Sequence, residues 1–327
     1  MKTQIVTLVG LERITGSIGL ALQSGDLGLT IVGHDRDRSL AAEAKKLGIV
    51  SQVTNNLATA ASGADILIVN VSLSDLEQTL EIAGAEVREH TLVVDLSNMK
   101  GVGQKWADKY MVEGHYVGAK PVLAADTLTD GRMGIEASRA DLFKNSVFCI
   151  MPSVKADPKA VETAVNLGRI LGATPFFLDA YEYDSLTQGI EVVPGLIAAA
   201  MLRAMTKSTG WRDMLRFAGL GFAQSTASLD NPDLARLALN DKKASLRWLD
   251  AVLGELQEVR RWINESDEER FTFIVEELTI EREQWLHERR ENNWIEDDSS
   301  NVSTAGIARQ LMGFGFGRGD EQSKKGS

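Results

Sequence analysis

Cysteine is almost absent from this chain of 327 residues, whose single thiol is Cys149. One cysteine excludes a disulfide within the chain, and its position inside the apolar run 146–152 indicates a small buried hydrophobic residue. Histidine is also scarce, and the four histidines lie far apart without the spacing of metal ligands. We therefore expect a cytoplasmic protein, kept in a reducing environment, that holds no metal ion.

Excess positive charge and long apolar runs are missing as well. The net charge is -11 with an isoelectric point near 5.0, and no basic stripe is present, which argues against binding to a phosphate backbone. The best candidate for a membrane span, residues 195–202, is ended by Arg203 and falls short of the roughly 20 residues that a span requires. We expect neither a nucleic-acid partner nor a membrane partner.

The first 180 residues alternate short apolar runs with helical patterns. Runs that are apolar throughout are typical of strands buried on both faces of a parallel sheet. We expect a doubly wound, mostly parallel α/β domain of the Rossmann type over residues 1–180. The predicted strands fall within 3–10, 29–35, 64–72, 91–98, 115–122, 146–152 and 173–179. The predicted helices between them include 38–47, 75–87 and 158–171.

Strand signals stop after about Tyr181, so we expect an all-helical domain over residues 181–295, where Pro194 kinks one helix and Pro232 begins another. A helical domain after a nucleotide domain often forms the substrate cleft and a dimer interface, which predicts a homodimer. The Gly/Ser-rich, charged segment 296–327 is predicted to be a disordered tail. Helices are expected at 181–207, 211–228, 232–264 and 267–290.

The start of the chain carries the strongest functional signal. An apolar strand runs into a turn at Gly10 and then directly into a helix, which is how backbone N–H groups and a helix N-terminus hold a dinucleotide. In this turn Gly10, Ile14, Gly16 and Ser17 are the candidate cofactor residues, with the Ser17 hydroxyl as the N-cap of the helix.

The dinucleotide fingerprint is nevertheless incomplete. Counted from Gly10, the second and third glycine positions hold Glu12 and Thr15, and the Glu12 carboxylate would lie near a pyrophosphate. Asp35, at the end of the second strand, is placed to receive the ribose hydroxyls of NAD, whereas its neighbour Arg36 would accept the 2′-phosphate of NADP. The sequence leaves the choice between NAD and NADP open.

Six segments add a further pattern through their order: GLERITGS (10–17), VDLSNMKG (94–101), VGAKP (117–121), DLFKNSVFCIMPS (141–153), LGATPFFLDAYEYDSLTQGIEVVPGLIAAAM (171–201) and GLGFAQSTAS (219–228). Their order and spacing, over roughly residues 3–265, resemble the prephenate and arogenate dehydrogenase family. The resemblance implies oxidation of a small cyclohexadienyl carboxylate with NAD or NADP, with loss of carbon dioxide to form an aromatic ring.

The catalytic positions implied by this resemblance differ from the family's pattern. Lys120 stands in place of the catalytic histidine, and Asn98 stands in place of the serine that hydrogen-bonds it, with Ser97 adjacent. An ordinary lysine is a cation at neutral pH, so we expect Lys120 to bind a carboxylate or polarise a carbonyl rather than act as a base.

The resemblance also assigns substrate and cofactor positions. Lys100 matches the family and Tyr183 replaces a family histidine, so both are candidate substrate residues. Ala227 replaces the arginine that grips a substrate carboxylate, and alanine cannot form that bidentate contact. Val71 and Ser72 replace the Val-Pro pair that follows the third strand beside the cofactor.

Three functions remain open from the sequence. The first is an NAD(P)-dependent dehydrogenase of the prephenate type with an altered substrate. The second is a catalytically silent dimeric relative that binds a metabolite or a protein partner. The third is a reductase in which Lys120 donates a proton to a carbonyl or imine.

Overall fold

A computed structural model describes residues 4–25, 27–128 and 130–293 of the chain. The described residues form one compact unit. The tail predicted at 296–327 lies outside the described residues.

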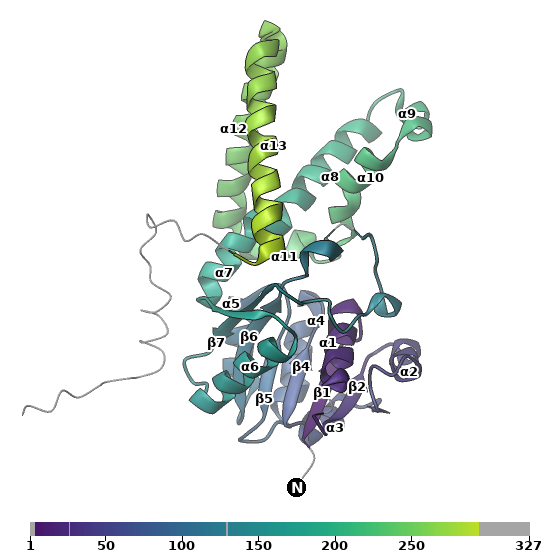
Figure 1. Cartoon of the computed structure of the whole chain (residues 1–327), viewed down its shortest axis with the longest axis vertical. Coiled ribbons are helices and arrows are strands. Elements are labelled where there is room, and N and C mark those ends of the chain that lie inside the picture. Colours follow the sequence, from purple (N-terminus) through teal and green to yellow (C-terminus); the bar gives the residue numbers. More distant parts are fainter. Residues whose placement is uncertain (1–3, 26, 129, 294–327) are drawn as a thin grey trace, which may run out of the picture. The chain divides into compact units, whose positions relative to one another are not determined.

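The unit is built on an eight-stranded sheet with the strand order β3-β2-β1-β4-β5-β6-β7-β8 (Figure 1). Neighbouring strands are parallel except for β6 and β7, which pair antiparallel. The sheet confirms the mostly parallel, Rossmann-type fold, and β3 is the one strand of the sheet that the sequence patterns did not predict. The strands are β1 Ile5–Val9, β2 Thr30–His34, β3 Gln52–Val53, β4 Ile66–Val69, β5 Leu92–Asp95, β6 His115–Pro121, β7 Val147–Pro152 and β8 Thr174–Phe177.

Helices cover both faces of this sheet, and each face has its own apolar core. One core joins Leu8 of β1 to Ile18 of α1 and Leu167 of α6, and the other joins Leu67 of β4 to Leu76 of α4. Strands that are covered on both sides must be apolar throughout, which explains the unbroken apolar runs. The helices of this part are α1 Arg13–Ser24, α2 Arg38–Lys46, α3 Leu57–Gly63, α4 Leu73–Gly84, α5 Lys100–Tyr110 and α6 Pro158–Ile170.

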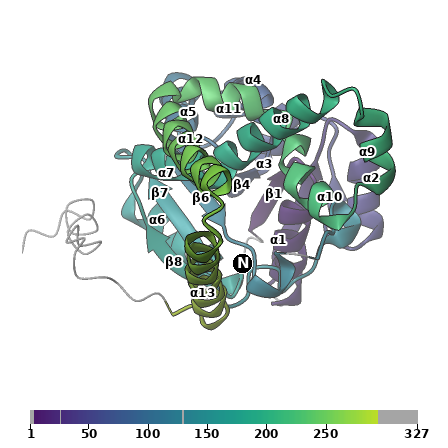
Figure 2. The same cartoon turned by 90° about the horizontal axis from the view of Figure 1, so that it is seen from above.

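The chain after β8 is helical, as the sequence predicts. Figures 1 and 2 both show α8, α9 and α10 clustered together, and α12 packs on α13 through Trp262 and Phe271, whose rings lie 5.7 Å apart. The helices are α7 Ala180–Thr187, α8 Val193–Thr206, α9 Trp211–Phe217, α10 Leu220–Thr226, α11 Leu234–Asn240, α12 Lys242–Glu265 and α13 Glu268–Glu291. Short turns complete the unit: η1 Ala125–Thr127, η2 Ile135–Ala137, η3 Gln188–Val192 and η4 Ala227–Asp230.

Local geometry differs from the predicted helices at two prolines. Pro194 does not kink a continuous α-helix; a π-helical turn, η3, comes before it and places Pro194 in the first turn of α8, where no N–H is needed. Pro232 lies just before α11, and the predicted helix 232–264 breaks at Asp241, whose carboxylate accepts a hydrogen bond from Ala244 N and caps α12.

One helical stretch among the described residues, Ala180–Thr206, is long and apolar enough to span a bilayer by length and composition. Its first part packs into the unit, because Tyr183, Asp184 and Gln188 are all buried. Only 28% of its most apolar window is buried, so the rest of this stretch presents an apolar surface that the unit itself does not cover.

Candidate functional site

The turn after β1 has the geometry of a nucleotide-binding start at its first glycine. Gly10 has a φ of +80°, which favours glycine, and its N–H donates to His34 O at 3.0 Å. A Cβ at Gly10 would lie 2.0 Å from Asn70 O, so no larger residue fits between the ends of β1 and β4. The structure therefore requires the glycine that the sequence placed first in the fingerprint.

The two non-glycine residues of the turn hold it together. Glu12, and not the predicted Ser17, is the N-cap of α1, and Glu12 N donates to Thr15 Oγ1 at 3.0 Å. The Thr15 hydroxyl in turn donates to Gly10 O at 2.6 Å. Ser17 lies one turn further along the helix, where its hydroxyl donates to Arg13 O at 2.6 Å.

Asp35 lies beside this turn, as its predicted ribose role requires. Its carboxylate accepts hydrogen bonds from Leu11 N and Asp37 N, both at 2.7 Å. Burial of the Glu12 carboxyl, and then the negative charge of Asp35, raises the pKa of Glu12 above its usual value. Two carboxyl groups thus lie at the edge where a dinucleotide phosphate would approach.

The edge beside Arg36 is hollowed. Arg36 is held by α4, where it pairs with Asp75 and donates to Gln78 Oε1 at 2.7 Å. A hollow of about 420 Å³ opens between Arg36, the start of α3 and the exposed side of α4. Val71 and Ser72 precede α4 at the same edge, and the Ser72 hydroxyl bonds the Asp75 carboxylate at 3.0 Å.

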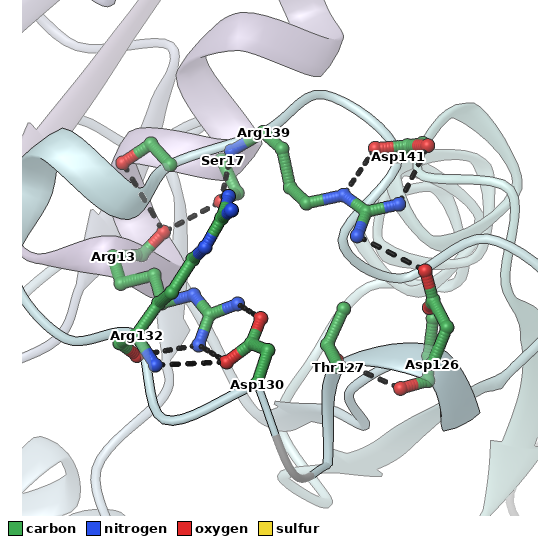
Figure 3. Close-up of polar contacts among 10 residues, drawn as sticks. Arg13, Ser17, Asp126, Thr127, Asp130, Arg132, Arg139 and Asp141 are labelled. Carbon is green, nitrogen blue, oxygen red and sulfur yellow. Dashed lines mark hydrogen bonds and ion pairs between the residues drawn. The ribbon is translucent and has the colours of Figure 1, made fainter.

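Two predicted cofactor residues, Gly16 and Ser17, contact the segment just after η2, and Figure 3 shows Ser17 next to Arg139 of that segment. A Cβ on Gly16 would lie 2.1 Å from Ser138 Oγ, and Arg139 N donates to Ser17 Oγ at 3.0 Å. Gly16 is therefore a close packing position inside α1 and not a flexible part of the turn. The hydroxyl of Ser17 bonds protein atoms, so the structure uses both residues to dock this segment, while Ile14 packs against the core.

Arg13 is fixed by the same segment. Its guanidinium pairs with the Asp130 carboxylate and donates to Arg132 O at 2.6 Å (Figure 3). The cation next to Glu12 is thus neutralised by Asp130 in this structure rather than left to face the nucleotide edge.

A second group of polar side chains lies at the carboxyl edge of the central strands. Lys120 of β6 places its Nζ 3.4 Å from Asn98 Oδ1, in the loop after β5, and 3.3 Å from Glu191 Oε1 on η3. Lys120 is 19% exposed and Glu191 39% exposed, so the ion pair is open to a ligand from one side. Cys149, the cross-strand partner of Lys120, is buried, and burial raises the pKa of its thiol to about 11.

Lys100 and Ser97 lie beneath this group, in the interior. Lys100 is fully buried, and its ammonium donates to Asp95 O at 2.8 Å and to Ser97 O. Burial, with the nearby Lys120 charge, lowers the pKa of Lys100 to about 8, although Asp95 opposes the shift. The Ser97 hydroxyl donates to Asp95 Oδ2 at 2.9 Å, which directs it into the core and away from the cleft.

The helical region closes the site from its other side. The Asp184 carboxylate accepts hydrogen bonds from Lys100 N and Gly101 N, at 2.7 and 2.8 Å, at the start of α5. Burial raises the pKa of Asp184 to about 6 in spite of these bonds. Burial also raises the pKa of Tyr183 well above its usual value, so its phenol stays neutral, with its ring 6.0 Å from Lys100 Nζ.

The structure thus brings together Lys120, Asn98, Lys100 and Tyr183 and adds Glu191, which sequence reasoning missed. Glu191 lies in the otherwise apolar stretch before Pro194, and an isolated acid at such a place was the available signal. Within the described ranges no group of three or more His, Cys, Asp or Glu side chains forms a possible metal site.

Comparison with known proteins identifies this arrangement. Residues 18–175 match the family model described as prephenate dehydrogenase, nucleotide-binding domain. The prephenate dehydrogenase of Bacillus subtilis is 27% identical over 277 residues, which are 82% of this chain and 72% of the relative. The chain is therefore similar to prephenate dehydrogenases in its nucleotide-binding region and over most of its length.

Solved structures of this family share the fold over almost their whole length. The prephenate dehydrogenase of Aquifex aeolicus, in complex with hydroxyphenyl propionate and NAD+, superimposes with a TM-score of 0.75 at 20% identity, covering 87% of this chain and 99% of that one. A Synechocystis arogenate dehydrogenase gives a TM-score of 0.66 at 18% identity, covering 86% of this chain and 100% of that one.

The family model that residues 18–175 match describes a nucleotide-binding domain. The match begins at Ile18, directly after the turn in which Glu12 and Thr15 stand at two fingerprint glycine positions. The chain therefore departs from the fingerprint just before the region that matches.

Proposed function

We propose that this protein is an NAD(P)-dependent dehydrogenase that oxidises and decarboxylates a cyclohexadienyl acid of the prephenate or arogenate type. The observation that carries the proposal is the cluster of Lys120, Asn98 and Glu191 at the carboxyl edge of the sheet that also carries Gly10 and Asp35. Ligands of doubly wound folds bind at that edge.

The cofactor fits this edge along its length. Gly10 permits the tight turn at the end of β1, Asp35 accepts a hydrogen bond from that turn, and the hollow beside Arg36 accepts an adenosine. Arg36 is already held by Asp75 and Gln78. A 2′-phosphate would meet the Asp35 carboxylate without a free arginine to compensate it, which favours NAD over NADP.

The substrate is a small carboxylate whose ring hydroxyl lies next to the ammonium of Lys120. Asn98 orients that ammonium through its amide oxygen, while the buried Lys100 and Ser97 shape the loop that carries Asn98. When bound, the nicotinamide supplies the hydride acceptor. We further propose that residues 1–180 hold this cofactor and that the helical region 181–295 closes over the substrate.

The test has two stages. Titration with NADH and NADPH by fluorescence comes first. Absence of binding at millimolar concentration would exclude both the dehydrogenase and the reductase. Turnover of prephenate and arogenate with NAD+ and NADP+ follows. Lys120→Ala should abolish turnover, whereas Lys105→Ala, an exposed lysine on α5, should leave it within about twofold, because a side chain outside the cleft contributes little to transition-state binding.

A reductase is the second candidate, and the ion pair of Lys120 with Glu191 favours it, because a charged lysine can donate a proton to a carbonyl or imine. Oxidation of NADH with a cyclic keto or imino acid, together with no turnover of prephenate or arogenate, would select the reductase. Binding of a cofactor without turnover in either direction would select a silent relative.

We also propose a homodimer formed through the helical region. Large apolar side chains of α12 and α13 are exposed in this chain, among them Leu256, Ile263, Phe273 and Ile280. Exposed apolar surface on this scale is typical of an interaction surface. Light scattering should give twice the chain mass, and Leu256→Glu should shift the protein toward monomer. The acidic charge of -11 fits a cytoplasmic enzyme that binds no nucleic acid.

A further inference from the structure

A π-helical turn carries Glu191 next to Lys120. The turn η3, Gln188–Val192, inserts one residue into the path from α7 to α8, a feature that recurs at functional sites. Its neighbours anchor it: Gln188 accepts from Ser245 Oγ at 2.9 Å, and a Cβ on Gly189 would lie 2.9 Å from the Trp248 ring. The carboxylate of Glu191 is therefore fixed next to Lys120, with Oε1 3.3 Å from Nζ.

The proposed oxidation needs a group that accepts the hydroxyl proton. Lys120 cannot accept this proton while its side chain is an ammonium in an ion pair with Glu191, because an ammonium has no free lone pair. Tyr183 is neutral, and its hydroxyl cannot serve as a base until its own proton is lost.

Other acids near the cleft have no free acceptor atom. Both Asp184 oxygens receive backbone N–H groups of α5, and Asp95 receives Ser97 N, Ser97 Oγ and Tyr116 OH. Glu191 remains as the carboxylate in contact with Lys120 that is also open to solvent, among the described residues.

Two of the histidines lie away from this cluster. His34 is buried, and its Nδ1 lies 3.0 Å from Thr54 O. His115 starts β6, at the opposite end of the strand from Lys120, where its Nδ1 accepts from Asp157 N. Neither can replace the histidine that the family uses.

Given the dehydrogenase function proposed above, we propose that Glu191 is the general base of this chain and that Lys120 is its electrostatic partner. Lys120 donates a hydrogen bond to the substrate hydroxyl oxygen, and Glu191, within 3.3 Å of the same ammonium, accepts the hydroxyl proton. The two side chains together do what one histidine does in the family.

Protons and electrons balance in this reaction. The hydroxyl O–H bond breaks and the proton passes to Glu191, while hydride leaves the same carbon for the bound nicotinamide, forming a carbonyl. The bond between the ring and its carboxylate then breaks, carbon dioxide leaves, and the electron pair enters the ring. The former carbonyl oxygen becomes the phenol oxygen and takes back the proton from Glu191.

Several charged groups act on this pair. Lys120 comes from β6, Lys100 from α5, Asp95 from β5, and Tyr183 and Asp184 from α7. From α12, Arg247 lies near the turn, 3.5 Å from Ser185 Oγ. Lys120 is the charged group in direct contact with the Glu191 carboxylate, at 3.3 Å.

The experiment compares Glu191→Gln and Glu191→Asp with Glu182→Gln, an exposed glutamate of α7, as the matched control. Glu191→Gln should lower kcat by about 10²- to 10⁴-fold and remove the acid limb of the kcat/KM profile against pH. NADH affinity, measured by fluorescence, should stay within about twofold because Glu191 contacts substrate and not cofactor. Glu191→Asp should keep part of the activity, and formate should restore part of it in Glu191→Ala.

A readout without substrate tests the geometry. In protein with ¹³C-methylated lysines, the Lys120 signal, assigned from Lys120→Met, should shift in Glu191→Gln and stay in place in Glu182→Gln. An unmoved Lys120 signal, or a kcat of Glu191→Gln within about threefold of wild type, would refute the role of Glu191 as the base. Either result would leave the proposed dehydrogenase function standing. If wild-type protein turns over neither substrate with either cofactor, the proposed function fails, and the role of Glu191 fails with it.

Discussion

The buried hydrogen bond between Tyr116 and Asp95 offers a measurable link between the core and the site. The Tyr116 hydroxyl donates to Asp95 Oδ2 at 2.6 Å, and both residues are buried. Asp95 also accepts hydrogen bonds from Ser97 N at 2.8 Å and from Ser97 Oγ at 2.9 Å, so it fixes the loop that leads to Asn98. The change to test is Tyr116→Phe, which removes one hydroxyl and keeps the ring.

The expected loss follows from the charge and burial of the acceptor. A hydrogen bond to a charged group contributes about 1.5–3 kcal/mol, and a carboxylate that loses one of three donors in the interior cannot recruit water in exchange. We expect Tyr116→Phe to lower the free energy of unfolding by about 2 kcal/mol. Because Asp95 keeps both bonds to Ser97, the fold should persist.

Tyr110→Phe is the matched control. Tyr110 OH also donates to a carboxylate, Glu77 Oε1, at 2.9 Å, but that carboxylate lies at the surface, where water replaces the lost hydroxyl. Urea unfolding followed by far-UV circular dichroism gives the free energy of unfolding of each variant, with one m-value used for both fits. Equal losses in the two variants would refute the reasoning that burial, and not the bond alone, sets the magnitude.

Three further changes test other parts of the structure. Glu12→Gly should tighten NADH binding about three- to tenfold by removing a carboxylate beside the pyrophosphate; unchanged affinity in a fluorescence titration would contradict this. Gly103→Ala would place a Cβ 2.4 Å from the Asp95 carboxylate and should cost about 3 kcal/mol in urea unfolding, whereas Gly63→Ala, with open space around it, should cost far less. Burial lowers the pKa of Lys100 from 10.5 to about 8, so between those pH values the unfolded chain holds more protons and stability rises with pH relative to Lys100→Met. The gain should reach about 3 kcal/mol, and a difference that stays flat with pH would oppose the assignment.

The sheet was predictable because its signals are local. Strands such as β5, Leu92–Asp95, are buried at every residue and therefore read as unbroken apolar runs. The helix that follows Gly10 was also predictable, because its signal is local: a strand, a glycine turn and a helix follow one another directly in the sequence. By contrast, β3 has only two residues, Gln52–Val53, and so short a segment carries no periodicity of its own.

Helix ends in the second half followed capping and packing that the pattern did not reveal. The break before α12 depends on the Asp241 cap, and the π turn η3 depends on Trp248 and Ser245 packing around Gly189 and Gln188. The contacts around η3 join residues more than fifty positions apart, which no local window includes.

The sequence alone determined the fold class, the resemblance to prephenate and arogenate dehydrogenases, and the placement of Lys120 and Asn98 at the ends of neighbouring strands, because parallel strands bring their carboxyl ends to one edge. Only the tertiary structure decided which side chains face that edge. It turns Ser97 and Lys100 into the interior toward Asp95, and it brings Glu191 from a distant helical turn to within 3.3 Å of Lys120. Residue type and spacing specify the strands, whereas the direction of a side chain depends on what packs against it from elsewhere in the chain.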